Sequence, residues 1–254
     1  MDQIYRFSYQ ENQYNGECLP CTAAVFNQLV DSKEVAWKIG TRQAVEKAIM
    51  EDMPLDVFAN DSKFVQFCRR QQSESFALLP LAMKLLQWTN SLKMSLPCFI
   101  FGVRDFALVP KTDKEGNPVL DKQGKPVMTR RRKLEGIEHL SSLFMFDGDH
   151  LSIDPCEVYE RTLRPKFPWK VQLAHKTSSG HGLRLVCEAR LELGNIADNQ
   201  ICLARELGLM GMLGTTGKPV VDDSCIDATR ISYCPRREDI YYIDEEHLFN
   251  LNIL

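Results

Sequence analysis

Apolar residues recur at helical spacing through most of the first ninety residues. Side chains three or four positions apart lie on one face of a helix, so this spacing predicts a mainly helical segment over residues 1–92. The Met53–Pro54 and Leu79–Pro80 steps mark breaks within it. We find no catalytic set of residues in this segment and expect it to brace the rest of the chain. The positions that keep the spacing are Ala23, Ala24, Phe26, Leu29 and Val30, then Val45, Ala48 and Ile49, then Phe76, Leu79, Met83, Leu86 and Leu92.

From residue 93 onward the apolar residues form short runs that are typical of strands. Leu96–Phe101, which ends at Gly102, predicts a buried strand. The uninterrupted run Leu143–Phe146 predicts a strand that is covered on both faces. Further strands are expected at 171–174, at 183–187, around Ile226 and 231–233, and at a sheet edge over 240–243; helices are expected from Asp154 to about Leu163, from Asn195 to Leu207, and at the end of the chain.

This succession predicts an α+β protein with a helical segment over 1–92 and a core over 93–254. Within the core, residues 111–133 hold two glycine-centred turns between short Val/Leu pieces, which indicates a protruding hairpin. This basic excursion is either a solvated loop or a finger that contacts phosphates. Its basic residues include Lys122 and Lys125 and, as our candidates for nucleic-acid binding, Arg130, Arg131, Arg132 and Lys133.

The composition narrows the class of protein. Of 254 residues, 44% are hydrophobic and 26% charged, which excludes a disordered or collagen-like chain. The formal net charge of −3 gives no overall positive field, so a polyanion would have to be held by local basic patches. Nine scattered cysteines are typical of the reduced thiols of an intracellular protein. We see neither a secretory signal nor an apolar run near the roughly 20 residues of a membrane span, and we expect a cytoplasmic protein with no membrane partner.

The sequence Phe146–Asp147–Gly148–Asp149 closes the apolar run at 143–146. Residues i and i+2 of a strand project from one face, so Asp147 and Asp149 are expected side by side at its carboxyl end. Two adjacent carboxylates in a partly dry place repel each other unless one takes up a proton or a cation neutralises both. Hard oxygen ligands of this kind suit Mg²⁺ or Mn²⁺. The alternative is an ordinary Asp-Gly turn after a strand.

A second motif lies between two expected strands, over residues 176–184. Gly180 and Gly182 leave backbone amides uncovered, as in an anion-binding nest, and Ser178 and Ser179 add hydroxyl donors. Alternation along the strand after this turn places Arg184 opposite the core-facing leucines, where its guanidinium would be available for bidentate contact with phosphate. The alternative is a plain Ser/Gly hairpin turn with a surface arginine.

A third motif is Asp227–Ala228–Thr229–Arg230, before the strand at 231–233. A third carboxylate from a distant strand would complete a two-metal site, in which paired ions clamp the attacking and leaving oxygens of an in-line displacement. The alternative is a surface Asp227–Arg230 pair.

In order and setting, the three motifs resemble those of the archaeo-eukaryotic primase superfamily, and most closely its VirE N-terminal-like branch of mobile-element primase-polymerases. That branch shows Leu-Pro-x-Phe, a strand ending in Asp-x-Asp, Ser-x-Ser-Gly-x-Gly-Leu-Lys/Arg, and Asp-x-x-Arg before an aromatic strand. The resemblance spans roughly residues 93–243 and leaves 1–90 uncovered. The corresponding segments here are Leu96–Pro97–Cys98–Phe99, Phe146–Asp147–Gly148–Asp149, Thr177–Ser178–Ser179–Gly180–His181–Gly182–Leu183–Arg184, and Asp227–Ala228–Thr229–Arg230–Ile231–Ser232–Tyr233.

The resemblance implies a mixed-sheet primase-polymerase core with an RRM-like half and template-directed nucleotidyl transfer on single-stranded DNA, with NTPs or dNTPs, in replication of a mobile element or phage. It further implies that two Mg²⁺ or Mn²⁺ ions are held by Asp147, Asp149 and Asp227. Ser179, His181 and Arg184 would contact the triphosphate, and Arg230 would orient Asp227 or touch phosphate.

Two departures from the family pattern stand in this sequence. Primases often carry His at the position of Arg184. Many relatives are fused to a helicase-like ATPase, whereas this sequence has no Gly-x-x-x-x-Gly-Lys-Ser/Thr loop, so unwinding would need a separate helicase partner. Two other functions stay open: a non-catalytic nucleotide- or DNA-binding module of a mobile-element complex, and a metal-dependent nuclease.

Overall fold

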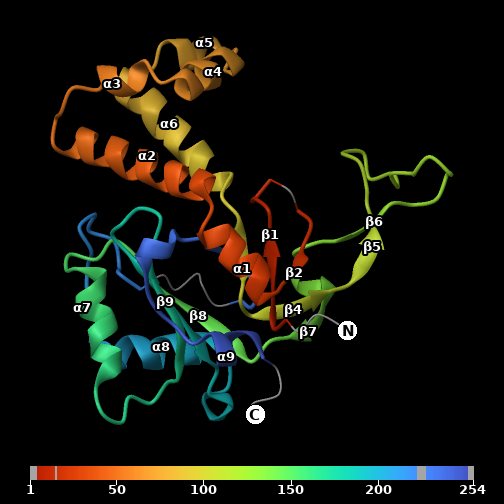
Figure 1. Cartoon of the computed structure of the whole chain (residues 1–254), viewed down its shortest axis with the longest axis vertical. Coiled ribbons are helices and arrows are strands. Elements are labelled where there is room, and N and C mark those ends of the chain that lie inside the picture. Colours follow the sequence, from red (N-terminus) through yellow and green to blue (C-terminus); the bar gives the residue numbers. More distant parts are fainter. Residues whose placement is uncertain (1–4, 15, 222–226, 251–254) are drawn as a thin grey trace.

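The structure is a computed structural model, and it describes residues 5–14, 16–221 and 227–250 (Figure 1). Two strands and then six helices are followed by a run of strands, and strands and helices are interspersed only in the last part of the chain. The first half contains β1 (Phe7–Gln10), β2 (Leu19–Cys21), α1 (Ala23–Val30), α2 (Lys33–Met50), α3 (Asp56–Ala59), α4 (Ser62–Arg70), α5 (Glu74–Ala77), α6 (Leu81–Met94), β3 (Cys98–Ile100), β4 (Val103–Phe106) and β5 (Leu108–Pro110). The second half contains β6 (Met128–Arg130), β7 (Ile137–Leu140), β8 (Leu143–Gly148), α7 (Pro155–Glu160), β9 (Val171–Lys176), β10 (Leu183–Glu188), α8 (Ile196–Glu206), β11 (Ser232–Tyr233), β12 (Ile240–Ile243) and α9 (Glu245–Phe249).

The strands of the described residues form two four-stranded sheets and two short ribbons. One sheet has the order β11-β3-β1-β2 and the other the order β12-β9-β10-β8, while β4 pairs with β7 and β5 with β6. The α+β class is confirmed. The expected mixed sheet is not, because the described strands pair only in antiparallel fashion. The connection between β9 and β10 is too short for a crossover, so these two strands can pair only in antiparallel fashion.

Strand β8 separates two hydrophobic cores. Leu143 and Met145 face the cluster that contains Phe7, and Phe144 and Phe146 face a second cluster beneath α7 and α8. Every residue of β8 is buried. The prediction of a strand covered on both faces is therefore confirmed, and it places the Asp-x-Asp at the end of the most enclosed strand of this sheet.

The N-terminal region is mainly helical, as expected, but its first residues form two strands that were not predicted. Strands β1 and β2 join the first sheet, and Phe7 packs against Phe26 of α1 through Phe99 of β3. These aromatic side chains are fully buried, so the start of the chain shares its core with the residues after 93. The helices α2–α6 form a lobe of their own, visible at the top of Figure 1, around a separate cluster that includes Trp88.

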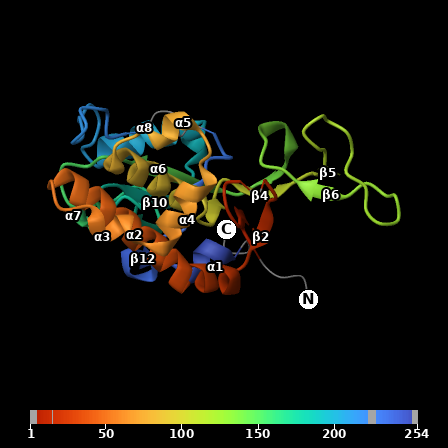
Figure 2. The same cartoon turned by 90° about the horizontal axis from the view of Figure 1, so that it is seen from above.

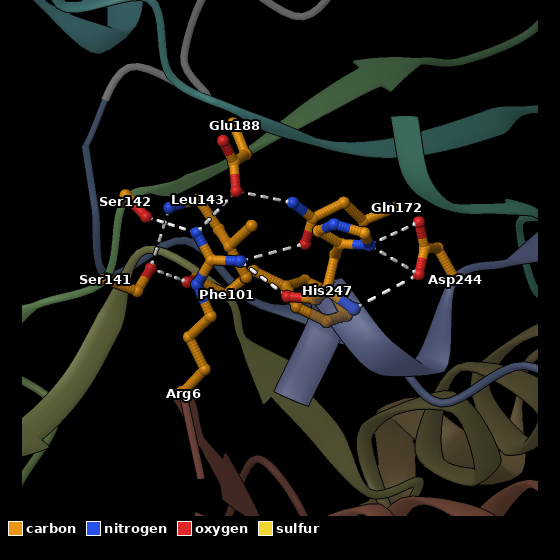
Figure 3. Close-up of polar contacts among 9 residues, drawn as sticks. All are labelled: Arg6, Phe101, Ser141, Ser142, Leu143, Gln172, Glu188, Asp244 and His247. Carbon is orange, nitrogen blue, oxygen red and sulfur yellow. Dashed lines mark hydrogen bonds and ion pairs between the residues drawn. The ribbon is translucent and has the colours of Figure 1, made fainter. Parts of the chain in front are cut away.

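A buried arginine ties the start of the chain to the second sheet (Figure 3). Arg6 is 3% exposed, and its guanidinium pairs with Glu188 of β10 at 2.9 Å. It also donates to Gln172 of β9 at 3.1 Å, to the carbonyl of His247 in α9 at 2.6 Å, and to Ser142. A charge this deep is tolerated because each of its nitrogens in the network has an acceptor.

The expected local signals in the second half are found where the sequence places them. Asp154 caps α7 by accepting from the amide of Cys156, with Pro155 in the first turn. Asn195 caps α8 in the same way, and β12 is an edge strand. Among the described residues, none of the helices combines the length and the apolar character needed to cross a bilayer.

Residues 111–127 form an arm that projects from the β5–β6 ribbon, well clear of the other elements (Figure 2). Its two turns are built alike. The carboxylates of Asp113 and Asp121 each accept two backbone amides, at 2.9 Å each in the first turn and at 2.8 and 2.9 Å in the second. Gly116 and Gly124 supply the positive φ that each turn needs. The predicted protruding hairpin and its two glycine-centred turns are confirmed, whereas the aspartate that organises each turn was not predicted.

Candidate functional site

The site is organised by a row of three side chains across the second sheet. Arg184 of β10 lies opposite Asp147 of β8 on one side and opposite His175 of β9 on the other. Directly opposed residues of antiparallel strands project from the same face, here the face toward α2 and α6. The guanidinium of Arg184 forms an ion pair with the carboxylate of Asp147, whose side chain is 2% exposed.

A pocket of about 170 Å³ opens above this row. Asp149 lines it from the end of β8, and Ser179 and Arg184 line it from the turn between β9 and β10 and the start of β10. The structure therefore brings together residues of two of the three sequence motifs. Asp147 lies beneath the pocket, in contact with Arg184.

The Ser/Gly turn is held by its own backbone and hydroxyl groups. The amide of Thr177 donates to the carbonyl of Gly182, and the amide of Gly180 donates to the carbonyl of Thr177, both at 2.9 Å. The hydroxyls of Thr177 and Ser179 lie 3.0 Å apart. Gly180 has a φ of +83°, as the sequence predicts. Gly182 does not have a positive φ, so its backbone conformation does not explain why a glycine is needed there.

Gly182 lies where three oxygens converge. A Cβ there would lie 2.7 Å from the carbonyl oxygen of Gly148 and 2.8 Å from Asp149 Oδ1 and from Thr177 Oγ1. We expect Gly182→Ala to destabilise the fold by about 1–3 kcal/mol through overpacking. Urea unfolding checks this, with Gly136→Ala as the control because its Cβ would meet only an ordinary contact at 3.6 Å. Equal stability of the two variants would contradict the expected clash.

Helix α2 lies against this turn. Arg42 donates to the hydroxyl of Ser178 at 3.3 Å and pairs with Glu46 at 2.7 Å. The amide nitrogen of Gln43 lies 3.5 Å from the carbonyl of Ser178. The helical lobe thus holds the Ser/Gly turn directly, and the absence of a recognisable motif before residue 93 left no means to predict this contact.

Two further residues of the pocket also escaped the sequence analysis. Lys93, near the end of α6, lines the pocket, and its ammonium lies 5.1 Å from the ring centroid of Tyr233 in β11. Burial lowers the pKa of Lys93, and the nearby charge of Arg42 lowers it further. Within residues 5–14, 16–221 and 227–250, Lys93 pairs with no carboxylate. A partly desolvated cation of this kind favours an anionic ligand.

His175 is the third member of the row and is 1% exposed. Its Nδ1 lies 2.8 Å from the carbonyl of Lys176, so Nδ1 carries the proton and Nε2 accepts from Ser232 at 3.2 Å. Burial lowers the pKa of His175 from 6.5 to about 4, against smaller raising effects of the Lys176 carbonyl and of Asp239. The imidazole is therefore neutral in the folded protein at neutral pH.

This lowered pKa predicts a loss of stability in acid. The unfolded chain takes up a proton at His175 near pH 6.5, whereas the folded protein resists it until about pH 4. The contribution of His175 to the free energy of unfolding is at its maximum above pH 6.5, and it falls by roughly 3 kcal/mol as the pH drops to 4. Urea unfolding between pH 7 and 4 measures it against His175→Gln, which should lack this part of the slope. Identical slopes would contradict a neutral, buried His175.

The residues at the pocket fit a hard divalent cation by donor type, because Asp147 and Asp149 supply carboxylate oxygens. Cation binding to Asp147 would replace its present partner, Arg184. In the part of the chain that the structure describes, no group of three or more His, Cys, Asp or Glu side chains is placed to hold a metal ion. Asp149 lines the pocket and Asp147 lies beneath it, paired with Arg184, and a two-ion site stays a prediction.

The third predicted carboxylate lies in a different setting. Asp227 and Arg230 line a small cavity with Gly102 and Phe144, and neither lines the pocket of Asp149. The carboxylate of Asp227 accepts from the amide and the hydroxyl of Thr229, at 2.7 and 2.6 Å. The structure therefore does not bring Asp227 beside Asp149, and the expectation at Ile226 lies outside the described residues.

The remaining candidates lie around the site. His181 is exposed and does not line the pocket. Of the basic candidates at 130–133, Arg131 donates to the carbonyl of Thr112, and Arg132 to the carbonyl of Thr229, both at 3.2 Å. These two arginines brace the base of the arm, whereas Arg130 and Lys133 are exposed.

Comparisons of the chain with models of known protein families, with curated proteins and with solved structures found no match.

Proposed function

We propose that the protein carries out template-directed nucleotidyl transfer on single-stranded DNA, as a DNA primase or polymerase that uses NTPs or dNTPs. The observation that supports this most strongly is the shared pocket. Asp149 of the Asp-x-Asp motif and Ser179 and Arg184 of the Ser/Gly turn line one cavity, although they come from different strands. Carboxylates beside a cationic, hydroxyl-lined turn are what a metal-bound triphosphate needs.

Each group has a role in this proposal. Arg184 and the Ser179 hydroxyl hold phosphate oxygens, and the Ser/Gly turn adds backbone donors. Asp147 and Asp149 hold Mg²⁺ or Mn²⁺, with Asp227 as the third ligand that the family resemblance implies. The ion would lower the pKa of the attacking 3′-hydroxyl and offset charge on the α-phosphate. The exposed His181 has no contact in the pocket that supports its predicted role.

The template would contact basic residues outside the pocket. The arm at 111–127 carries four lysines against three carboxylates, so it is nearly neutral and offers little attraction for phosphates. Arg130 and Lys133 at its base are the stronger candidates, because they are exposed. Binding through such residues weakens steeply with salt. A role in mobile-element or phage replication is implied by the same resemblance. The cytoplasmic location and the separate helicase partner stay predictions from the sequence.

A second function is favoured by one observation. Asp147 pairs with Arg184, and Asp227 lines a cavity apart from Asp149. Carboxylates arranged in this way suit a non-catalytic nucleotide- or DNA-binding module as well as an enzyme whose site is completed by metal and substrate.

One assay separates these functions. The protein is incubated with single-stranded DNA, labelled nucleotides and Mn²⁺ or Mg²⁺, beside an Asp149→Ala variant. The proposal predicts extended or newly primed product from the wild type alone. Nucleotide binding without product would favour the non-catalytic module, and degraded template would identify a metal-dependent nuclease.

A further inference from the structure

We propose that Arg42 and Lys93 of the helical lobe contact the phosphate chain of a bound nucleoside triphosphate, together with Arg184 of the sheet. The lobe would then form one wall of the nucleotide pocket. The inference rests on the proposed function, which assigns a triphosphate to this pocket but takes all of its ligands from the sheet and its turns.

The first support is the position of Arg42. It lies in the middle of α2, lines the pocket, and donates to Ser178 within the Ser/Gly turn at 3.3 Å. Glu46 lies one helical turn further along α2 and pairs with Arg42. This ion pair holds the guanidinium in one orientation. Planar guanidinium groups held in this way present their remaining donors to phosphate in a defined geometry.

The second support is Lys93. Its ammonium reaches the same pocket from α6 and lies over Tyr233, with no carboxylate partner among the residues that the structure describes. Holding a cation in a partly dry place costs free energy unless an anion binds there. A phosphate group would supply that anion, and the ring of Tyr233 would help to position the ammonium.

The third support is the charge and size of the pocket. Among its lining residues Arg42, Lys93 and Arg184 are cationic, and Asp149 is the one carboxylate in the described part of the lining. Its volume of about 170 Å³ is smaller than the roughly 300–1,000 Å³ of pockets that enclose a whole small ligand. It therefore suits the phosphate end of a nucleotide whose base lies outside.

The test is equilibrium binding of a fluorescent nucleoside triphosphate to the full chain, with and without Mg²⁺. We expect Lys93→Met and Arg42→Met each to weaken triphosphate binding by about 10- to 100-fold, the effect of losing a charge-assisted hydrogen bond. Binding of the monophosphate should change by less than about threefold, since it lacks most of the phosphate chain. Inorganic tripolyphosphate should displace the label from the wild type.

Two controls make the result specific. Lys47→Met removes an exposed cation from the same helix α2 and should bind triphosphate as the wild type does. Lys93→Arg keeps the charge and should retain binding, which covers the case in which Lys93→Met fails to fold.

The outcomes separate the two proposals. A wild type that binds triphosphate while the Lys93 and Arg42 variants bind it equally well overturns this inference and leaves the proposed function standing. A wild type that binds no nucleoside triphosphate at all overturns both.

Discussion

Replacement of Asp147 by alanine is expected to destabilise the protein by about 3–5 kcal/mol, the typical effect of removing one partner of a buried ion pair. Asp147 is 1% exposed, and it pairs with Arg184, whose side chain is 13% exposed. The variant would keep a buried guanidinium without its carboxylate. Urea unfolding at neutral pH measures the loss.

A double variant tests whether the pair is responsible. Asp147→Ala/Arg184→Met removes both charges and should recover a large part of the lost stability, because an apolar replacement of a buried pair is often neutral or better. A double variant that is less stable than Asp147→Ala would show that Arg184 stabilises the fold through other contacts. The structure thus makes Asp147→Ala an unsuitable test of catalysis on its own.

Asp149 is the better position for that purpose. Asp149→Ala is expected to lower metal-dependent nucleotide incorporation by at least about 100-fold, because it removes a ligand for the charge-offsetting ion. Asp149 is half-buried at the pocket, so stability should change by less than about 1 kcal/mol. Steady-state incorporation and urea unfolding on the same preparation give the two values.

Substitutions at two other carboxylates make this experiment more specific. Glu157→Gln changes an acidic side chain on α7, outside the pocket, and should leave incorporation unchanged. Asp227→Ala tests the third ligand that the resemblance implies. A loss as large as that of Asp149→Ala would support the three-carboxylate site, whereas full activity would restrict the metal site to the Asp-x-Asp. Full activity of Asp149→Ala would contradict the proposed role of this motif.

The sequence was most informative where local signals agree with packing. The run Leu143–Phe146 could be assigned to a doubly covered strand because each of its residues is apolar, and β8 packs against a core on each side. The Asp154 cap before Pro155 located α7 within a few residues. Alternation from Leu183 to Cys187 placed Arg184 on the face away from the second core, which is where the pocket lies.

The features that the sequence could not predict depend on contacts between distant segments. Strand β1 is too short for alternation to identify, and it forms because Phe7 packs against Phe99 and Phe101. Arg42 and Lys93 resemble ordinary surface residues of amphipathic helices until the lobe is placed over the sheet. The separation of Asp227 from Asp149 could not be predicted either, because the order of motifs along the sequence does not fix the distances between them in the fold.

The measurement that tests the central claim most directly is anomalous diffraction from crystals of the protein soaked with Mn²⁺ and a non-hydrolysable nucleoside triphosphate. We predict a manganese peak bound to the carboxylates of Asp147 and Asp149, with the phosphate chain against Arg184 and Ser179. Manganese and phosphates located outside this pocket, or a pocket that stays without both at saturating concentrations, would contradict the proposed site.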